Sequence, residues 1–197
     1  MRHKLASVLS YLLARLTNAG ARQENAENNI MISFHKIPSG LSFFSPAVLV
    51  ASFMGSGLIR PASGTWGSLA SVLCAALILP YVPQIWFVGF AAIAYVIGLW
   101  ASHVWIAQEI NQEHADPQAI VIDEVAGQWL AIAFAPSGWL GLVLAFALFR
   151  FFDITKVWPA SWADKKLHGA QGVMLDDIFA GLWAVICLLV IQYFEIL

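Results

Sequence analysis

The sequence predicts an all-α membrane protein, a polytopic helical bundle of about five spans with a re-entrant or interfacial segment before them. Two observations lead to this prediction. Hydrophobic residues make up 60% of the 197 residues and charged residues only 11%, whereas soluble domains carry roughly 25% charged residues. Apolar stretches also follow one another from about residue 43 to the C-terminus without a long polar interruption. The nine Trp fit this class, because amphipathic aromatic side chains collect at membrane interfaces.

Apolar runs of membrane length define the individual elements. Segment 41–59 is apolar, but Pro46, Gly55 and Gly57 interrupt it, which favours a re-entrant or interfacial piece over a span. We therefore expect a membrane-embedded domain over residues 41–197, preceded by a surface or disordered tail over residues 1–40. The five stretches that are long and apolar enough to be spans are 68–82, 84–106, 120–135, 138–152 and 178–194.

The distribution of basic residues predicts the orientation. Consecutive spans alternate in direction, so their connections fall into two sets. One set contains only tight Pro-bearing turns without Lys or Arg, and the other carries Arg60, Arg150, Lys156, Lys165 and Lys166. The positive-inside rule places the second set in the cytoplasm. The net charge of −2 and the lack of a basic run argue against a nucleic-acid partner.

A loop rich in Gly, Ser and Thr covers residues 55–68 and leads into the first predicted span. Backbone N–H groups of such a loop and the following helix N-terminus can hold a phosphate, which makes Gly64, Thr65 and Ser68 candidate phosphate-binding residues. The alternative is that these residues cap the helix and let the chain turn sharply.

Asp123 and Glu124 stand side by side at the start of the third predicted span, shortly after Asp116. Adjacent acids are costly near lipid, so they should face a bundle interior, a cavity or a cation. Asp123 alone could be a helix cap. Because the small residues Ala126 and Gly127 follow and permit close helix approach, we favour a functional role for the pair.

A second acid pair, Asp176 and Asp177, stands just before the last predicted span and is also followed by small residues. Two helices can thus present four carboxylates to one site. Oxygen ligands of this kind suit Mg²⁺, which leaves coordination positions for water and phosphate oxygens.

Arg150, Asp153 and Lys156 lie three residues apart at the end of the fourth predicted span. This spacing is compatible with a plain ladder of salt bridges along a helix. Basic groups beside a metal site would equally bind phosphate.

At these residues the sequence resembles the phosphatidylglycerophosphatase A family. The resemblance covers roughly residues 50–190 and departs from the usual pattern at Ser63 and Val157, where relatives commonly have proline. It implies a Mg²⁺-dependent phosphatase in the bacterial inner (cytoplasmic) membrane, with phosphatidylglycerophosphate as its phospholipid substrate and an active site on the cytoplasmic side. The blocks that carry it are the loop at 55–68, Asp-Pro and Val-Ile-Asp-Glu-x-x-Gly at 116–127, Arg-Phe-Phe-Asp-Ile-x-Lys at 150–156 and His-Gly-x-x-Gly-Val-Met-Leu-Asp-Asp at 168–177.

Each candidate residue receives an expected role. Arg150 and Lys156 neutralise phosphate charge, and Asp153 acts as a base or positions these two cations. The absence of an Asp-x-Asp-x-Thr signature favours water over a carboxylate as the nucleophile. The expected metal ligands, which also orient the attacking water, are Asp123, Glu124, Asp176 and Asp177.

Two alternatives remain at this stage. The acids could line the pathway of a cation transporter, or they could serve another metal-dependent enzyme that acts on phospholipid head groups. A transporter should place its acids near the middle of the spans, whereas the acids here are expected at one entrance.

Overall fold

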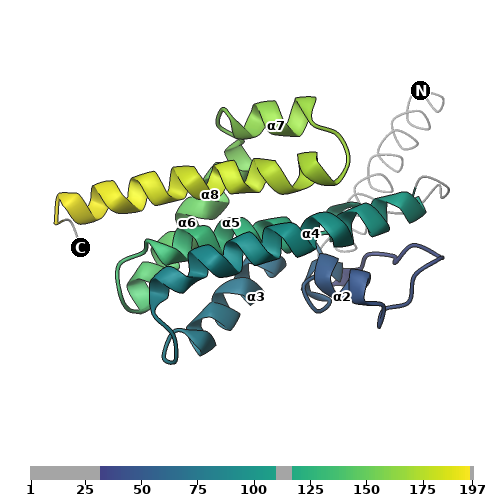
Figure 1. Ribbon diagram of the computed structural model, residues 1–197, viewed down its shortest axis with the longest axis horizontal. Coiled ribbons are helices and arrows are strands. Elements are labelled where there is room, and N and C mark those ends of the chain that lie inside the picture. The colour runs from purple at the N-terminus through teal and green to yellow at the C-terminus, as the bar shows by residue number, and fades with distance from the viewer. Residues whose placement is uncertain (1–31, 110–116, 196–197) are drawn as a thin grey trace, which may run out of the picture. The chain divides into compact units, whose positions relative to one another are not determined.

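The computed structural model describes residues 32–109 and 117–195, and its described residues from 34 onward belong to one compact unit (Figure 1). Most of the tail predicted over residues 1–40 lies outside the described residues. The described chain is mainly helical, and two short strands pair into a small sheet. The helices are α2 (Pro46–Ala51), α3 (Ser63–Ile78), α4 (Phe87–Glu109), α5 (Ile122–Ala133), α6 (Trp139–Thr155), α7 (Ala160–Lys166) and α8 (Ala170–Tyr193), the 3₁₀ turns are η1 (Ser56–Leu58), η2 (Gln84–Trp86) and η3 (Pro117–Ala119), and the strands are β1 (Ser33–Phe34) and β2 (Ile59–Arg60).

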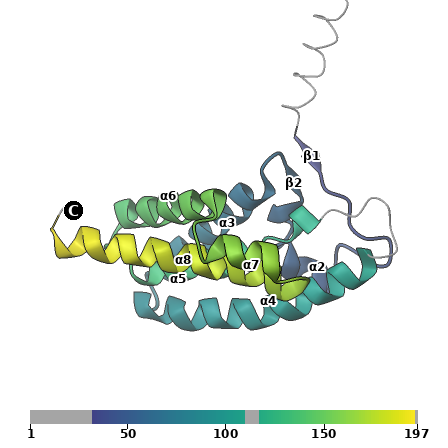
Figure 2. The ribbon, with the colours of Figure 1, turned by 90° about the horizontal axis from the view of Figure 1, so that it is seen from above.

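Helix α5 is the central element of the compact unit. It packs against α8, α4, α3 and α6, and α4 and α8 run in opposite directions along it (Figures 1 and 2). Its buried face is largely apolar, with Val125, Ala131 and Ile132 fully buried. The residues around α5 therefore form the core that positions both acid pairs.

Helices α5 and α8 cross at two glycines. A side chain on Gly127 would collide with the backbone of Asp177, and one on Gly181 would collide with the backbone of Gly127. The small residues predicted to allow close helix approach therefore do so at this crossing. In a helix, residues four apart share a face. Asp123 lies one turn before Gly127 and Asp177 lies one turn before Gly181, so the close crossing brings these two acids together.

The five-span prediction is confirmed in part. Helices occupy all five predicted spans, but within the described residues two segments, Gln84–Gln108 and Ala170–Tyr193, have both the length and the composition to cross a membrane. The 12 residues of α5 extend about 18 Å, against a hydrocarbon core of about 30 Å. Helix α5 is thus a buried central helix that falls short of spanning length.

Segment 41–59 agrees with the sequence prediction, whereas the start of the last helix differs from it. Segment 41–59 contains the six-residue α2 followed by η1, so it has no helix of spanning length, in agreement with the preference against a crossing. The last helix begins at Ala170, directly after Gly169 at φ 69°, and not at residue 178. Asp176 and Asp177 therefore lie about two turns inside α8 and not at its N-terminus.

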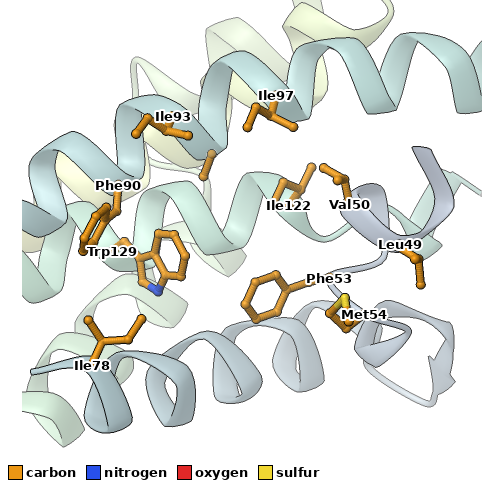
Figure 3. A pocket seen from close by; sticks show the side chains of 11 residues that line it. Leu49, Val50, Phe53, Met54, Ile78, Phe90, Ile93, Ile97, Ile122 and Trp129 are labelled. Carbon is orange, nitrogen blue, oxygen red and sulfur yellow. The ribbon is translucent and has the colours of Figure 1, made fainter. Parts of the chain in front are cut away.

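An apolar cavity of about 360 Å³ opens between α2, α3, α4 and α5. Figure 3 shows Ile122 and Trp129 of α5 facing Ile93 and Ile97 of α4 across it. Within the described part of the chain, no ionisable side chain lines this cavity. It therefore offers no group for acid–base or metal chemistry.

Candidate active site

Many of the charged residues of the bundle line a second cavity, which has a volume of about 540 Å³. Its walls come from the start of α3, from η3, from the start of α5, from the end of α6, and from α7 and α8. Segments that are far apart in the sequence thus meet at one place, as the candidate-site prediction requires. The charged residues that line this cavity are Asp123, Glu124, Arg150, Asp153, Lys156, Asp164 and Asp176.

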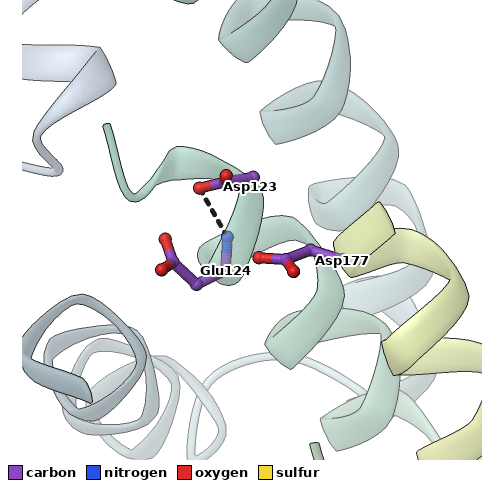
Figure 4. A group of neighbouring side chains, drawn as sticks. All are labelled: Asp123, Glu124 and Asp177. Atoms are coloured by element: carbon purple, nitrogen blue, oxygen red, sulfur yellow. Dashed lines mark hydrogen bonds between the residues drawn. The ribbon is translucent and has the colours of Figure 1, made fainter. Parts of the chain in front are cut away.

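Three carboxylates lie together beside this cavity. Asp123, Glu124 and Asp177 each offer one oxygen, and these oxygens all lie within 4.8 Å of one another. Figure 4 shows Asp177 of α8 directed toward Glu124 and Asp123 of α5. Oxygen ligands stand about 2.1 Å from Mg²⁺, so this separation suits a shared cation. Helices α5 and α8 thus bring three of the four expected carboxylates to one place, and Asp176 is not in this group.

The position of Asp123 and Glu124 follows from the local structure of α5. Both acids stand in its first turn, where the partial positive charge of the helix N-terminus favours carboxylates. The Glu124 backbone N–H donates to Asp123 Oδ1 at 3.0 Å. The Val121 backbone N–H donates to the Ala51 carbonyl at 2.8 Å, which fixes the start of α5 to α2.

Burial makes these two carboxyls difficult to ionise without a compensating charge. Burial raises the pKa of Glu124 to about 8, and the nearby charges of Asp177 and Asp153 add to this effect. Burial and the charge of Glu124 likewise raise the pKa of Asp123 well above its ordinary value. Glu124 Oε2 is buried and has no hydrogen-bond partner in the described part of the chain. A divalent cation would satisfy that oxygen and favour the ionised carboxylates.

Arg150 connects α6 to the glycine-rich loop and to the carboxylates. Its guanidinium donates to the Asp153 carboxylate, and its Nη1 lies 4.0 Å from Glu124 Oε1. Nη1 also lies 3.5 Å from Ser68 Oγ, and Nη2 lies 3.4 Å from Thr65 Oγ1. Arg150 Nε is buried without a hydrogen-bond partner among the described residues. These contacts therefore hold the guanidinium in place and leave its Nε–H donor unused by the residues that the structure describes.

The loop residues support this arrangement from α3, whose first turns hold Gly64, Thr65 and Ser68. A side chain at Gly64 would collide with the Glu124 carboxylate and the Arg150 guanidinium. Glycine at this position therefore leaves room for the ion pair. Thr65 and Ser68 contact the Arg150 guanidinium and are not among the residues that line the cavity.

Lys156 forms a second charged group in the same cavity. Its Nζ donates to Asp176 Oδ2 and lies 3.4 Å from Asp164 Oδ1. Burial alone would lower the pKa of the Lys156 ammonium, but the hydrogen bond to Asp176 and the neighbouring carboxylates raise it above its ordinary value. Lys156 is therefore a fixed positive charge at neutral pH.

Asp176 differs from the other expected metal ligands because it binds Lys156 and is not part of the group formed by Asp123, Glu124 and Asp177. Its second oxygen, Oδ1, is buried and has no hydrogen-bond partner within the described ranges. The sequence analysis also predicted no role for Asp164, which lies in α7 and forms a salt bridge with Lys156. Asp116 lies outside the described residues.

Clustered carboxylates beside a cavity that holds an arginine and a lysine are typical of an enzyme that acts on phosphate esters, and two helices of the bundle are long and apolar enough to cross a membrane. The family model for phosphatidylglycerophosphatase A matches residues 49–192. The chain belongs to this family.

Individual relatives agree with the family assignment. The chain is 39% identical over 154 residues to the phosphatidylglycerophosphatase A of Haemophilus influenzae. The match covers 78% of this chain and 93% of the relative. The chain is 33% identical over 144 residues to the Escherichia coli protein of the same name, covering 73% of this chain and 81% of the relative. A Bacteroides thetaiotaomicron protein, named as a putative phosphatidylinositol-3-phosphatase, is 33% identical to the chain over 153 residues. The match covers 74% of this chain and 93% of the relative. No solved structure matches the chain.

Proposed function

We propose that this chain is a phosphoric monoester hydrolase that converts phosphatidylglycerophosphate and water to phosphatidylglycerol and phosphate. The observation that carries the proposal is the group of Asp123, Glu124 and Asp177 beside a cavity that also holds Arg150 and Lys156. The carboxylates could bind a cation, and the two basic residues could bind the phosphate beside it. The family and the names of two relatives supply the lipid that bears the phosphate.

Mg²⁺ is the proposed cofactor, held by Asp123, Glu124 and Asp177. All three donors are carboxylates, and Mg²⁺ prefers oxygen ligands of this kind. Glu124 Oε2, which is buried without a hydrogen-bond partner among the residues that the structure describes, supports the fit. When bound, Mg²⁺ supplies positive charge to the phosphate oxygens and lowers the pKa of a coordinated water. Asp176 was expected as a fourth ligand, but its bond to Lys156 supports a positioning role first.

The basic residues bind and orient the phosphate. Arg150 offers a planar set of donors that matches two phosphate oxygens, and Asp153 holds it in place. Lys156 adds a second positive charge, and Asp176 and Asp164 hold it. Thr65 and Ser68 steady the guanidinium, and Gly64 leaves the room that it needs.

The residues of the cavity also constrain the chemical step. We call Asp123, Glu124 and Asp177 the carboxylate triad. The oxygen of water bonds to phosphorus as the bond from phosphorus to the glycerol oxygen breaks. A carboxylate of the triad accepts a proton from the attacking water, because Asp153 is already bound to Arg150, and this proton then passes to the glycerol oxygen. Water remains the favoured nucleophile over a carboxylate.

The proposed location is the bacterial inner membrane, with a multi-pass topology and the cavity at its cytoplasmic side. Segments Gln84–Gln108 and Ala170–Tyr193 support the membrane assignment. The basic residues near the cavity support the cytoplasmic side by the positive-inside rule. Cysteine labelling at Lys165 in intact and opened cells tests the orientation, and labelling from outside the intact cell would contradict it.

The substrate is tested with the purified full chain in detergent micelles. We expect Mg²⁺-dependent phosphate release from phosphatidylglycerophosphate and much less from phosphatidylinositol 3-phosphate, the substrate class named for the Bacteroides relative. Preference for the inositol lipid would overturn the assigned substrate. Binding of Mg²⁺ without hydrolysis of either lipid would favour the cation transporter.

A further inference from the structure

Helix α7 and the turn before it present two tryptophans and two lysines to the outside. Trp158 is 70% exposed and Trp162 is 46% exposed, and Lys165 and Lys166 are exposed as well. Trp162, Lys165 and Lys166 lie three and four residues apart, so they share one side of the helix. We call these four residues the α7 face. An aromatic and basic surface of this kind is unusual for a helix that contacts only water.

The opposite side of α7 is fixed to the bundle. Ala160 and Ala163 are buried, and α7 packs alongside α8 (Figure 1). The indole N–H of Trp183 in α8 donates to the Trp158 carbonyl at 3.0 Å. Because Ala170–Tyr193 has the length and composition of a membrane helix, this bond fixes the α7 face to an element expected to lie in the bilayer.

Helix α7 is also a wall of the active cavity. Asp164 and Leu167 line that cavity, and Asp164 pairs with Lys156 inside it. Lys165 and Lys166, which follow Asp164 directly in the sequence, are exposed and are not among the residues that line the cavity. One short helix thus contributes to the phosphate cavity and, on another side, to the outer surface.

We infer that the α7 face binds the anionic head-group layer of the membrane and so holds the cavity entrance at the lipid surface. Tryptophan side chains place their apolar rings at the membrane interface with the indole N–H toward water. Lysines beside them are attracted by the negative charge of anionic lipids. The combination favours an anionic bilayer over a protein partner, and the inference goes beyond the proposed hydrolysis because it does not depend on any reaction.

Hydrogen–deuterium exchange of the full chain in lipid nanodiscs tests this inference. One set of discs contains phosphatidylcholine alone, and the other also contains phosphatidylserine, an anionic lipid that is not the proposed substrate. We expect slower backbone exchange over residues 158–168 in the anionic discs. The difference should shrink at high salt and vanish in K165Q/K166Q, while the matched control K36Q, which removes an exposed lysine outside α7, should keep it. Equal exchange in the two discs, or an unchanged difference in K165Q/K166Q, would overturn the inference.

Steady-state kinetics give a second readout. With the lipid substrate in anionic mixed micelles, K165Q/K166Q should raise KM, by roughly fivefold for each lysine removed, and leave kcat unchanged. A fall in kcat at constant KM would contradict a surface-binding role. If no lipid is hydrolysed but the exchange difference is present, the proposed function fails and the α7 face stands as a lipid-binding surface. If the lipid is hydrolysed but the exchange difference is absent, the α7 inference fails and the proposed function stands.

Discussion

The two acid pairs have similar sequences and different surroundings. Asp123 and Glu124 both contribute to the carboxylate triad from the first turn of α5. In the pair inside α8, Asp177 joins the triad and Asp176 binds Lys156. Neighbouring residues in a helix point about 100° apart. In α8 this separation brings Asp176 to Lys156 and Asp177 to the triad, whereas at the start of α5 both acids reach the triad. A shared sequence pattern therefore does not imply a shared role for each residue.

The largest expected effect is the loss of phosphate release when an acid of the triad is replaced. Asp123→Asn and Asp177→Asn each keep the size of the side chain and remove an anionic ligand. We expect each to reduce phosphate release by about 10²- to 10³-fold or more, with the protein still folded. Thermal unfolding together with phosphate release measures both. Normal turnover in either variant would exclude that residue from the proposed metal site.

A smaller effect is expected within the second pair. Asp176→Asn should lower turnover by roughly tenfold, because it acts through Lys156 and not as a main metal ligand. Lys156→Gln should have a similar effect, and the double variant should lose little more than either single variant, since the two residues form one unit. Additive losses in this cycle, or a loss for Asp176→Asn equal to that of Asp177→Asn, would contradict the distinction between the two acids.

The crossing that joins the two pairs can be disturbed directly. Gly127→Ala places a methyl group against the Asp177 backbone, so we expect a loss of about 1–3 kcal/mol in the free energy of unfolding and weaker metal binding. Gly89→Ala is the matched control, because Gly89 lies in α4 with open space around it. Chemical denaturation measures both variants. Equal stability of the two would show that the close crossing is not required.

A further expected effect is a pH dependence of the stability of the metal-free protein. Glu124 has a folded pKa of about 8, above its ordinary value of 4.5, so the folded state binds more protons between these values. Stability should therefore fall as pH rises from about 5 to 8, and added Mg²⁺ should restore more of it at pH 8 than at pH 6. Melting curves in a chelator and in Mg²⁺ measure this shift. If the protein in chelator became more stable over the same pH range, the account of a buried acid cluster that takes up protons in the absence of a cation would be contradicted.

Hydropathy predicted where the helices lie but not where they begin. Residues 170–177 of α8 include Gln171 and two acids, so the apolar pattern marks the later part of the helix and misses its first two turns. Hydropathy also cannot tell a buried central helix from a span, which is why the sequence predicts that α5 crosses the membrane. Its 12 residues show that it does not have the length.

The candidate site was predictable where its signal is local and was not where it depends on packing. Adjacent acids followed by small residues indicated both of the helices that contribute to the triad. The bond between Lys156 and Asp176 joins residues 20 apart through the packing of α6 on α8, and no spacing rule predicts it. The contact of Asp164 with Lys156 depends in the same way on the short helix α7.

The most direct test of the central claim is the rate of phosphate release from phosphatidylglycerophosphate as a function of Mg²⁺ concentration, measured for Asp123→Asn. Glu195→Gln is the matched control, since it neutralises an exposed acid just beyond the C-terminal end of α8. Both variants should first be shown to have the thermal stability of the unaltered protein. We predict that Glu195→Gln follows the unaltered protein and that Asp123→Asn releases almost no phosphate at low Mg²⁺ and recovers little at high Mg²⁺. Near-normal release by Asp123→Asn at limiting Mg²⁺ would contradict the assignment of the acid cluster to metal binding and catalysis.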